Sequence, residues 1–293
     1  MYLIIGGNSE IGGAAGRTLA ESGARVMATT RRPTGRGDGQ ITLDFAAPLG
    51  GWTPPPETQA ACIFVAVARL AACQADPTAS ALINCTRTIE LADRLAGAGV
   101  YTLFLSTNQV FDGRDAQKPA DAPASPVSEY GRQKALTEAA LKERMAKGAA
   151  MGILRLAKVV SPGMALLCDW RRELSAGRSI RAFTDMTMAP TPVGLVSRAI
   201  ALMLRDREPV IAQLTGARDV AYADIGRFIA RRVGADERLV EPVSALANGM
   251  PPGATPANTT LDSSYLRDVY GLVVPDAFDV IAESLASYAG SAA

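Results

Sequence analysis

The chain begins Met1-Tyr2-Leu3-Ile4-Ile5-Gly6-Gly7-Asn8-Ser9-Glu10-Ile11-Gly12-Gly13. The apolar run over 2–5 has no helical period and is followed directly by glycines, which is typical of a buried strand that enters a tight turn. Residues 14–21 then favour a helix that stops at Ser22-Gly23. Glycines let a pyrophosphate approach the backbone, and a helix N-terminus presents free N–H groups. The opening stretch therefore predicts a dinucleotide-binding unit.

The residues after the second expected strand bear on the type of dinucleotide. This strand begins at Ala24 and ends in Thr29 and Thr30, and Arg31 and Arg32 follow. NAD-binding versions of the unit carry an acid near this point, which binds the ribose hydroxyls. Arginine instead pairs well with phosphate, such as the 2′-phosphate of NADP. We expect NADPH to be preferred over NADH, the alternative being that both arginines are ordinary loop charges.

Strands and helices alternate along the first half of the chain. Further strands are expected at 41–44, 61–68, 100–105 and 151–156, with helices at 78–96 and 130–145. This alternation is typical of a parallel sheet with helices on both faces. We predict an α/β fold with a Rossmann-type doubly wound parallel sheet and a smaller C-terminal substrate lobe. Residues 1–157 would form the NADP-binding domain, with returning segments near 186–212, and 158–293 mainly the substrate-binding lobe.

A tyrosine and a lysine stand one helical turn apart in Tyr130-Gly131-Arg132-Gln133-Lys134. On a helix they share one face, and an ammonium near a phenol lowers the tyrosine pKa. Such a tyrosine can transfer a proton at a carbonyl oxygen near neutral pH, and the Thr107 hydroxyl, at the end of an expected strand, could hold that oxygen. The spacing alone is also common in ordinary helices. Together with the dinucleotide unit it predicts a carbonyl–alcohol proton relay.

Composition narrows the function further. The chain has 293 residues, 48% of them hydrophobic, and a net charge of +1, so no electrostatic footprint indicates nucleic acid or an anionic membrane. Apolar stretches are too short for a membrane span, and we expect no signal peptide because the first strand starts at residue 2. Four cysteines without metal-ligand spacing fit a reduced, cytoplasmic protein. The absence of histidine excludes His-based triads and His-ligated metals, and we expect no metal site.

Taken in order, these motifs resemble those of the extended short-chain dehydrogenase/reductases, and most of all the dTDP-4-dehydrorhamnose reductase branch. The resemblance runs along nearly the whole chain and rests on these further motifs: Leu43-Asp44-Phe45, Asp76-Pro77 before Asn84, Leu105-Ser106-Thr107-Asn108-Gln109-Val110-Phe111-Asp112-Gly113, Tyr130-Gly131-x-x-Lys134, Ile153-Leu154-Arg155, Pro190-Thr191, Leu214-Thr215-Gly216 and Asn258-Thr259-Thr260-Leu261-Asp262.

The resemblance implies an NADPH-dependent reductase of carbohydrate biosynthesis that transfers a hydride to the keto group of a nucleotide-linked 4-keto-deoxysugar. It implies Tyr130 as general acid, Lys134 as the group that lowers its pKa and holds the nicotinamide ribose, and Thr107 as the residue that orients the carbonyl. The family often forms dimers, so the resemblance leaves open whether this chain forms a homodimer. The implied cofactor-binding residues are Gly6, Asn8, Ser9, Glu10, Ile11, Gly12, Arg31, Arg32, Asp44, Phe45, Ala66, Val67, Ala68, Tyr130 and Lys134, and the implied substrate-binding residues are Asn108, Val110 and Phe111.

Departures from the branch gather near the expected sugar site. Asn108-Gln109 replaces the usual Asp-Tyr, and the stretches 68–72 and 156–160 also differ, while Ser9 replaces the middle glycine of the turn. This pattern indicates a retained cofactor and proton machinery and altered sugar recognition. The alternatives are a sugar-nucleotide epimerase or dehydratase of the same superfamily, a non-catalytic NADP-binding sensor or subunit, and a reductase of other ketones.

Overall fold

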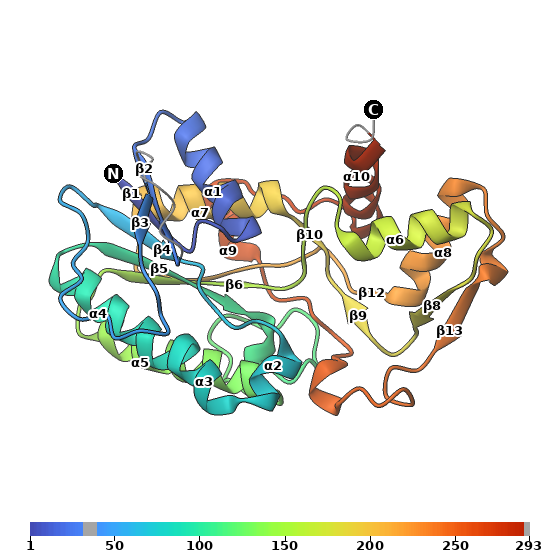
Figure 1. Cartoon of the computed structure of the whole chain (residues 1–293), viewed down its shortest axis with the longest axis horizontal. Coiled ribbons are helices and arrows are strands. Elements are labelled where there is room, and N and C mark those ends of the chain that lie inside the picture. Colours follow the sequence, from blue (N-terminus) through green and yellow to red (C-terminus); the bar gives the residue numbers. More distant parts are fainter. Residues whose placement is uncertain (32–39, 290–293) are drawn as a thin grey trace.

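The computed structural model describes residues 1–31 and 40–289 and contains one large parallel sheet (Figure 1). Its seven strands lie in the order β11-β6-β5-β4-β1-β2-β3, and every neighbouring pair is parallel. The strand order reverses between β1 and β4, where ligands of doubly wound sheets bind. The strands are β1 (Tyr2–Ile5), β2 (Val26–Thr30), β3 (Gln40–Thr42), β4 (Ala60–Ile63), β5 (Tyr101–Thr107), β6 (Met151–Leu156) and β11 (Ile211–Leu214).

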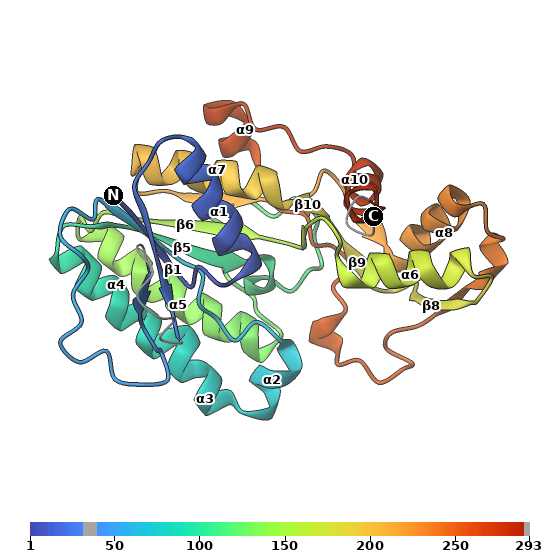
Figure 2. The ribbon, with the colours of Figure 1, turned by 45° about the horizontal axis from the view of Figure 1, so that its top comes forward.

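Helices cover both faces of this sheet because alternate strand residues point to opposite sides. Ile4 packs in the core under α1 (Glu10–Glu21), α7 (Val193–Asp206) and α9 (Ser264–Tyr270). Its neighbours Leu3 and Ile5 pack on the other side, under α4 (Thr88–Gly97) and α5 (Glu129–Ala146). Figure 2 shows α1, α7 and α9 on one face and α4 and α5 on the other. The predicted doubly wound sheet is confirmed.

The expected helix over 78–96 is divided into segments. After the short α2 (Leu70–Ala75) come α3 (Pro77–Ala81), a π-helical turn η1 (Leu82–Arg87) and α4. The π turn contains Asn84, whose side chain is buried. Such turns often occur at functional sites.

The second half of the chain builds a smaller lobe with its own apolar core. The core includes Leu167, Trp170, Ile225, Ile229 and Ile281. Its elements are α6 (Ala165–Ser175), α8 (Tyr222–Val233), α10 (Ala277–Ala289) and the parallel pair β8 (Ile180–Phe183) and β13 (Val240–Val243). The pairs β7 (Val159–Val160) with β10 (Thr191–Pro192) and β9 (Thr187–Met188) with β12 (Val220–Ala221) lie where the chain crosses between the halves. The 187–192 stretch therefore contains residues of two short strands, β9 and β10. The described residues also form the 3-10 turns η2 (Asn108–Val110), η3 (Glu237–Leu239) and η4 (Pro252–Ala254).

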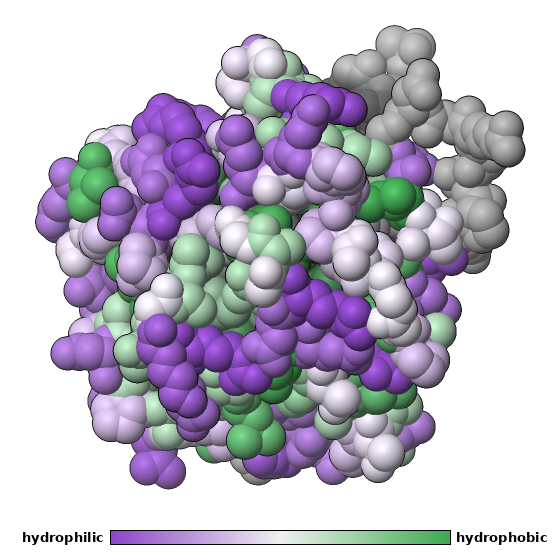
Figure 3. Space-filling view, turned by 90° about the vertical axis from the view of Figure 1, so that its left-hand side faces the viewer, coloured by the Kyte–Doolittle hydropathy of each residue, from purple (hydrophilic) through white to green (hydrophobic). Residues whose placement is uncertain are grey.

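The chain returns to the large sheet after this crossing: α7 packs on α1, and β11 extends the sheet beside β6. On the face drawn in Figure 3, hydrophilic residues predominate and hydrophobic residues are scattered. Among the helices of the described residues, none combines the length and apolarity that a membrane crossing requires.

Candidate active site

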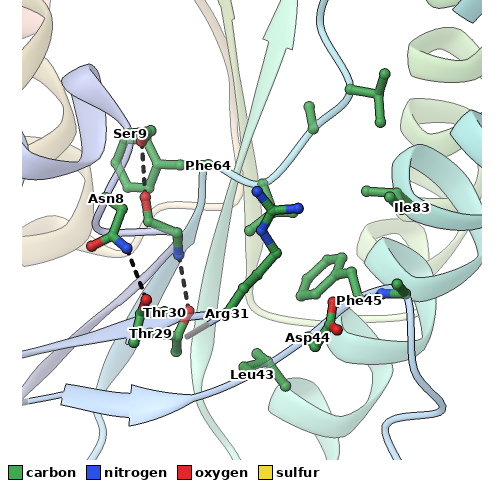
Figure 4. A pocket seen from close by; sticks show the side chains of 15 residues that line it. Asn8, Ser9, Thr29, Thr30, Arg31, Leu43, Asp44, Phe45, Phe64 and Ile83 are labelled. Atoms are coloured by element: carbon green, nitrogen blue, oxygen red, sulfur yellow. Dashed lines mark hydrogen bonds between the residues drawn. The ribbon is translucent and has the colours of Figure 1, made fainter. Parts of the chain in front are cut away.

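The glycine turn after β1 is fixed to the end of β2. The Gly6 N–H donates to Thr29 Oγ1 (2.9 Å), and Asn8 Nδ2 donates to Thr30 Oγ1 (2.8 Å; Figure 4). Gly6 has a φ of +93°, and a Cβ there would lie 2.9 Å from Val65 Cγ2. A Cβ on Gly12 would lie 2.8 Å from the Gly6 carbonyl oxygen. Glycine is therefore required at both positions, and the turn leaves backbone accessible beside the helix, as a pyrophosphate needs.

Ser9 fits the turn despite replacing a family glycine. Its φ is −72°, and its side chain caps α1 by accepting from the Gly12 N–H (3.1 Å). The Ser9 hydroxyl also donates to the Gly6 carbonyl (2.9 Å). A serine in extended conformation at an N-cap is favourable, so this departure leaves the turn geometry intact.

A cavity of about 460 Å³ lies at the carboxyl edge of the sheet, beside this turn (Figure 4). The expected cofactor residues that line it are Gly6, Asn8, Ser9, Arg31, Asp44, Phe45, Ala66 and Val67. The expected residues Glu10, Ile11, Gly12, Ala68, Tyr130 and Lys134 are not among its lining residues, and Arg32 lies outside the described residues. Lining residues that the sequence analysis did not assign are Thr29, Thr30, Leu43, Ala46, Phe64, Val65 and Ile83. The position of Thr29 and Thr30 at the end of a predicted strand could have indicated their place in the site. The apolar lining residues belong to no motif that would have indicated theirs.

Thr107 lies at the carboxyl end of β5. Its hydroxyl accepts from the Gln109 N–H (3.2 Å) and donates to Asn108 Oδ1 (3.3 Å). The first turn of α5 packs directly on the following segment, because a Cβ on Gly131 would lie only 2.1 Å from the Gln109 carbonyl oxygen. Gly131 therefore permits α5 to begin directly against the segment that follows β5, a role that the sequence analysis missed although it quoted the Tyr-Gly pair.

Lys134 extends from α5 against the same strand. Its buried Nζ donates to the Leu105 carbonyl (2.6 Å) and stands 4.1 Å from the centroid of the Phe104 ring. Desolvation lowers the pKa of Lys134 to about 8, although the nearby Glu138 carboxylate acts in the opposite direction. The ammonium therefore contacts β5 at Leu105, two residues before Thr107, and its burial disfavours the charged form.

The Tyr130 phenol has a raised pKa in this structure. Desolvation is the main cause, and the neighbouring Cys73 thiol adds to it. The spacing predicted a lowered pKa, but the Lys134 ammonium is bonded to the Leu105 carbonyl and is not among the groups that shift the pKa of Tyr130. Tyr130 is therefore protonated at neutral pH, which is the state that a general acid requires.

Two of the expected substrate residues point into the protein interior. Val110 and Phe111 are buried in a small apolar cluster with Leu261, whereas Asn108 is half-buried next to Thr107. The substrate-binding role of all three stays a prediction. Within residues 1–31 and 40–289, no group of His, Cys, Asp and Glu side chains is arranged to hold a metal ion.

A buried ion pair, which the sequence analysis did not single out, holds α5 in place. Arg155 on β6 is fully buried, and its Nη2 donates to Glu138 Oε2 on α5 (2.7 Å). Its Nη1 donates to the Ala120 carbonyl (2.9 Å) and to Gln213 Oε1 (3.0 Å). The pair therefore joins α5, β6, β11 and the loop before α5.

Solved structures of sugar-nucleotide enzymes share this fold. The dTDP-4-dehydrorhamnose reductase of Clostridium acetobutylicum matches with a TM-score of 0.81 at 18% identity, over 99% of both chains. A hypothetical dTDP-4-dehydrorhamnose reductase from Sulfolobus tokodaii matches with a TM-score of 0.75 at 18% identity, over 95% of this chain and 98% of that one. MoeE5, solved in complex with UDP-glucose and NAD, matches with a TM-score of 0.80 at 20% identity, over 100% of this chain and 99% of that one.

Sequence comparison identifies the family. The chain is 28% identical over 224 residues to the probable low-salt glycan biosynthesis reductase Agl14 of Haloferax volcanii, which covers 74% of this chain and 73% of that protein. The family model described as RmlD substrate binding domain matches residues 1–289. Because this match spans almost the whole chain, and because the resemblance read from the motifs agrees with it, the protein belongs to the RmlD substrate-binding-domain family.

Proposed function

We propose that the chain is an NADPH-dependent reductase that transfers a hydride to the keto group of a nucleotide-linked 4-keto-deoxysugar. The observation that carries the proposal is the close packing of α5 on the segment after Thr107, with the Lys134 ammonium bonded to the Leu105 carbonyl. This packing supports a joint action of Thr107, Tyr130 and Lys134. Relatives named as dTDP-4-dehydrorhamnose reductases and as a glycan biosynthesis reductase support the substrate class.

The cavity beside the glycine turn has the features that a dinucleotide needs. Backbone groups from Asn8 to Gly12 would hold the pyrophosphate, Asp44 and Phe45 would lie by the adenine, and Arg31 would pair with the 2′-phosphate. Figure 4 supports the last role, because the Arg31 side chain extends between the glycine turn and Phe45. When bound, NADPH supplies the hydride.

The proton step would belong to three side chains of this chain. Tyr130, kept protonated by its burial, would donate its phenolic proton to the oxygen of the reduced carbonyl. Thr107 would turn its hydroxyl from Asn108 toward that oxygen and orient it. Lys134 would stabilise the phenolate that remains, because a nearby ammonium favours the charged form.

In this proposal, residues 1–157 and the segments returning near 186–212 bind the cofactor, and 158–293 contribute mainly to the substrate site. The enzyme would act in the cytoplasm, in carbohydrate biosynthesis.

The test is NADPH oxidation measured with nucleotide-linked 4-keto sugars, including dTDP-4-dehydrorhamnose. We expect stoichiometric oxidation by the wild type. We expect Tyr130→Phe to lose about 10²- to 10⁴-fold in kcat, the usual contribution of a general acid, with NADPH affinity nearly unchanged. Conversion of a sugar nucleotide without net NADPH oxidation would indicate an epimerase instead, and tight NADPH binding without turnover of any ketone would indicate a sensor. A fully active Tyr130→Phe variant would refute the assigned acid.

A further inference from the structure

Gln133 lies between the two proton-relay residues of α5, and the proposed reaction does not use it. Its side chain is 1% exposed and fully hydrogen-bonded. Its Oε1 accepts from Asn84 Nδ2 (2.7 Å). Its Nε2 lies within hydrogen-bond distance of three acceptors: Ser80 Oγ (2.9 Å), Glu129 Oε1 (2.9 Å) and the Pro77 carbonyl (3.2 Å). Gln133 therefore ties α5 to α3 and to the π turn that contains Asn84.

Asn84 in turn holds the wall of the cofactor cavity. Its Oδ1 accepts from the Val67 N–H (2.8 Å), and its Nδ2 donates to the Val67 carbonyl (3.1 Å). Cys73 Sγ donates to the same carbonyl (3.1 Å). Val67 lines the cavity of about 460 Å³, outside any strand, so its backbone groups depend on these side chains for their hydrogen bonds.

We infer that Gln133 is a positioning residue that sets the distance between the proton relay on α5 and the cavity wall at Val67. The inference rests on the proposed function, because the wall matters to the reaction only if the cofactor binds there. Gln133 comes one residue before Lys134 and three residues after Tyr130, so its contacts with Asn84 fix how far α5 is rotated toward the cavity.

The position of Gln133 requires a side chain that both accepts and donates hydrogen bonds, as an amide does. Gln133 accepts from Asn84 and donates toward Ser80 and Glu129, so one side chain serves both directions. A glutamate would retain only acceptors and would face Glu129, and an apolar residue would leave Asn84 Nδ2 without this partner. Buried polar networks of this kind hold one arrangement only while each member is satisfied.

Thr137 offers a matched control one helical turn further along α5. Its buried hydroxyl lies within hydrogen-bond distance of two acceptors, the Asn84 carbonyl (2.9 Å) and the Gln133 carbonyl (3.0 Å). The contact with the Asn84 carbonyl joins α5 to the π turn but involves neither the Asn84 side chain nor Val67, and the contact with the Gln133 carbonyl lies within α5. Thr137→Val therefore weakens the packing of α5 without releasing the cavity wall.

The experiment compares Gln133→Met and Thr137→Val with the wild type. We expect Gln133→Met to raise the NADPH Kd and to lower kcat by about tenfold each, because a displacement of about 1 Å at a reacting group costs up to about 10²-fold. Hydrogen exchange at the Val67 amide should become faster in the same variant. Thr137→Val should lower Tm by a similar amount and change Kd, kcat and Val67 exchange by less than about twofold.

Unchanged Val67 exchange and NADPH Kd in Gln133→Met would overturn the inference, and so would equal kinetic losses in Thr137→Val. If Gln133→Met does not fold, Ser80→Ala removes one acceptor of the Gln133 amide and should shift Kd and exchange in the same direction by at least twofold; no shift would overturn the inference. A wild type that binds NADPH but reduces no ketone refutes the proposed reductase, whereas the Kd and exchange comparisons still decide the role of Gln133. A wild type that binds neither NADPH nor NADH contradicts both proposals.

Discussion

Replacing Lys134 by methionine should separate the stability of the fold from the chemistry of the site. The Lys134 ammonium is buried, and desolvation lowers its pKa from 10.5 in the free side chain to about 8. One pKa unit corresponds to about 1.4 kcal/mol, so burying the charged form disfavours the native state by about 3 kcal/mol. Its hydrogen bond to the Leu105 carbonyl, at 2.6 Å, holds the ammonium against β5.

The sign of the pH dependence follows from these two pKa values. Below pH 8 both the native and the unfolded chain carry the Lys134 proton, so its effect on stability is constant. Between pH 8 and pH 10.5 the unfolded chain binds the proton and the native chain does not, so the free energy of unfolding rises with pH. For this residue alone, the rise between pH 7 and pH 10 is about 2–3 kcal/mol. Lys134→Met has no titrating group at this position, so the variant lacks this rise in the free energy of unfolding.

The assay is urea unfolding of both proteins from pH 7 to pH 10 under reducing conditions. The quantity to follow is the free energy of unfolding of the wild type minus that of Lys134→Met, because titrating groups remote from Lys134 contribute equally to both proteins. The nearby thiols Cys62 and Cys85 are the exception, since burial raises their pKa values and the Lys134 ammonium lowers them. We expect this difference to increase with pH by about 2–3 kcal/mol, while the variant loses turnover and NADPH affinity. Lys147→Met, which removes an exposed ammonium from the end of the same helix, controls for net charge. A difference that stays constant from pH 7 to pH 10 would refute the lowered pKa.

Three further substitutions test separate parts of the structure. Gly131→Ala would place a Cβ 2.1 Å from the Gln109 carbonyl oxygen, so it should destabilise the fold by about 1–3 kcal/mol and lower kcat. Gly97→Ala, with open space around it, should do neither. Equal Tm values for the two variants would contradict the packing argument. Glu138→Leu leaves the Arg155 guanidinium buried without its carboxylate partner and should lower the free energy of unfolding by about 3–5 kcal/mol. Glu57→Gln, in an exposed pair, should lower it by less than about 1 kcal/mol, and urea titration measures both changes. Arg31→Glu should raise the NADPH Kd at least about tenfold and leave the NADH Kd within about twofold; equal changes for both cofactors would remove the 2′-phosphate role.

Local sequence pattern was sufficient for the fold class. The apolar run over 2–5 followed by glycines predicts a strand and a tight turn, because only glycine adopts the φ of +93° found at Gly6 without strain. The alternation of strands and helices predicts the parallel sheet, since parallel strands need helical crossovers. The Tyr-Lys spacing predicts one helix face, and both residues do lie on α5.

Long-range packing decided what the spacing could not. The pKa of Tyr130 is raised rather than lowered, because burial of the phenol and the direction of the Lys134 ammonium depend on β5 and not on α5 alone. The π turn at Asn84 replaced part of an expected regular helix.

The sequence by itself determined the order of elements and the residue types available for a proton relay, because these depend on neighbours within a few positions. Only the tertiary structure decided which atoms meet. Gln133 and Asn84 are 49 residues apart and Asn84 and Val67 are 17 apart, yet their amides form one hydrogen-bonded path from α5 to the cavity. No local pattern encodes that path, because each amide is an ordinary polar residue until folding buries it against its partner.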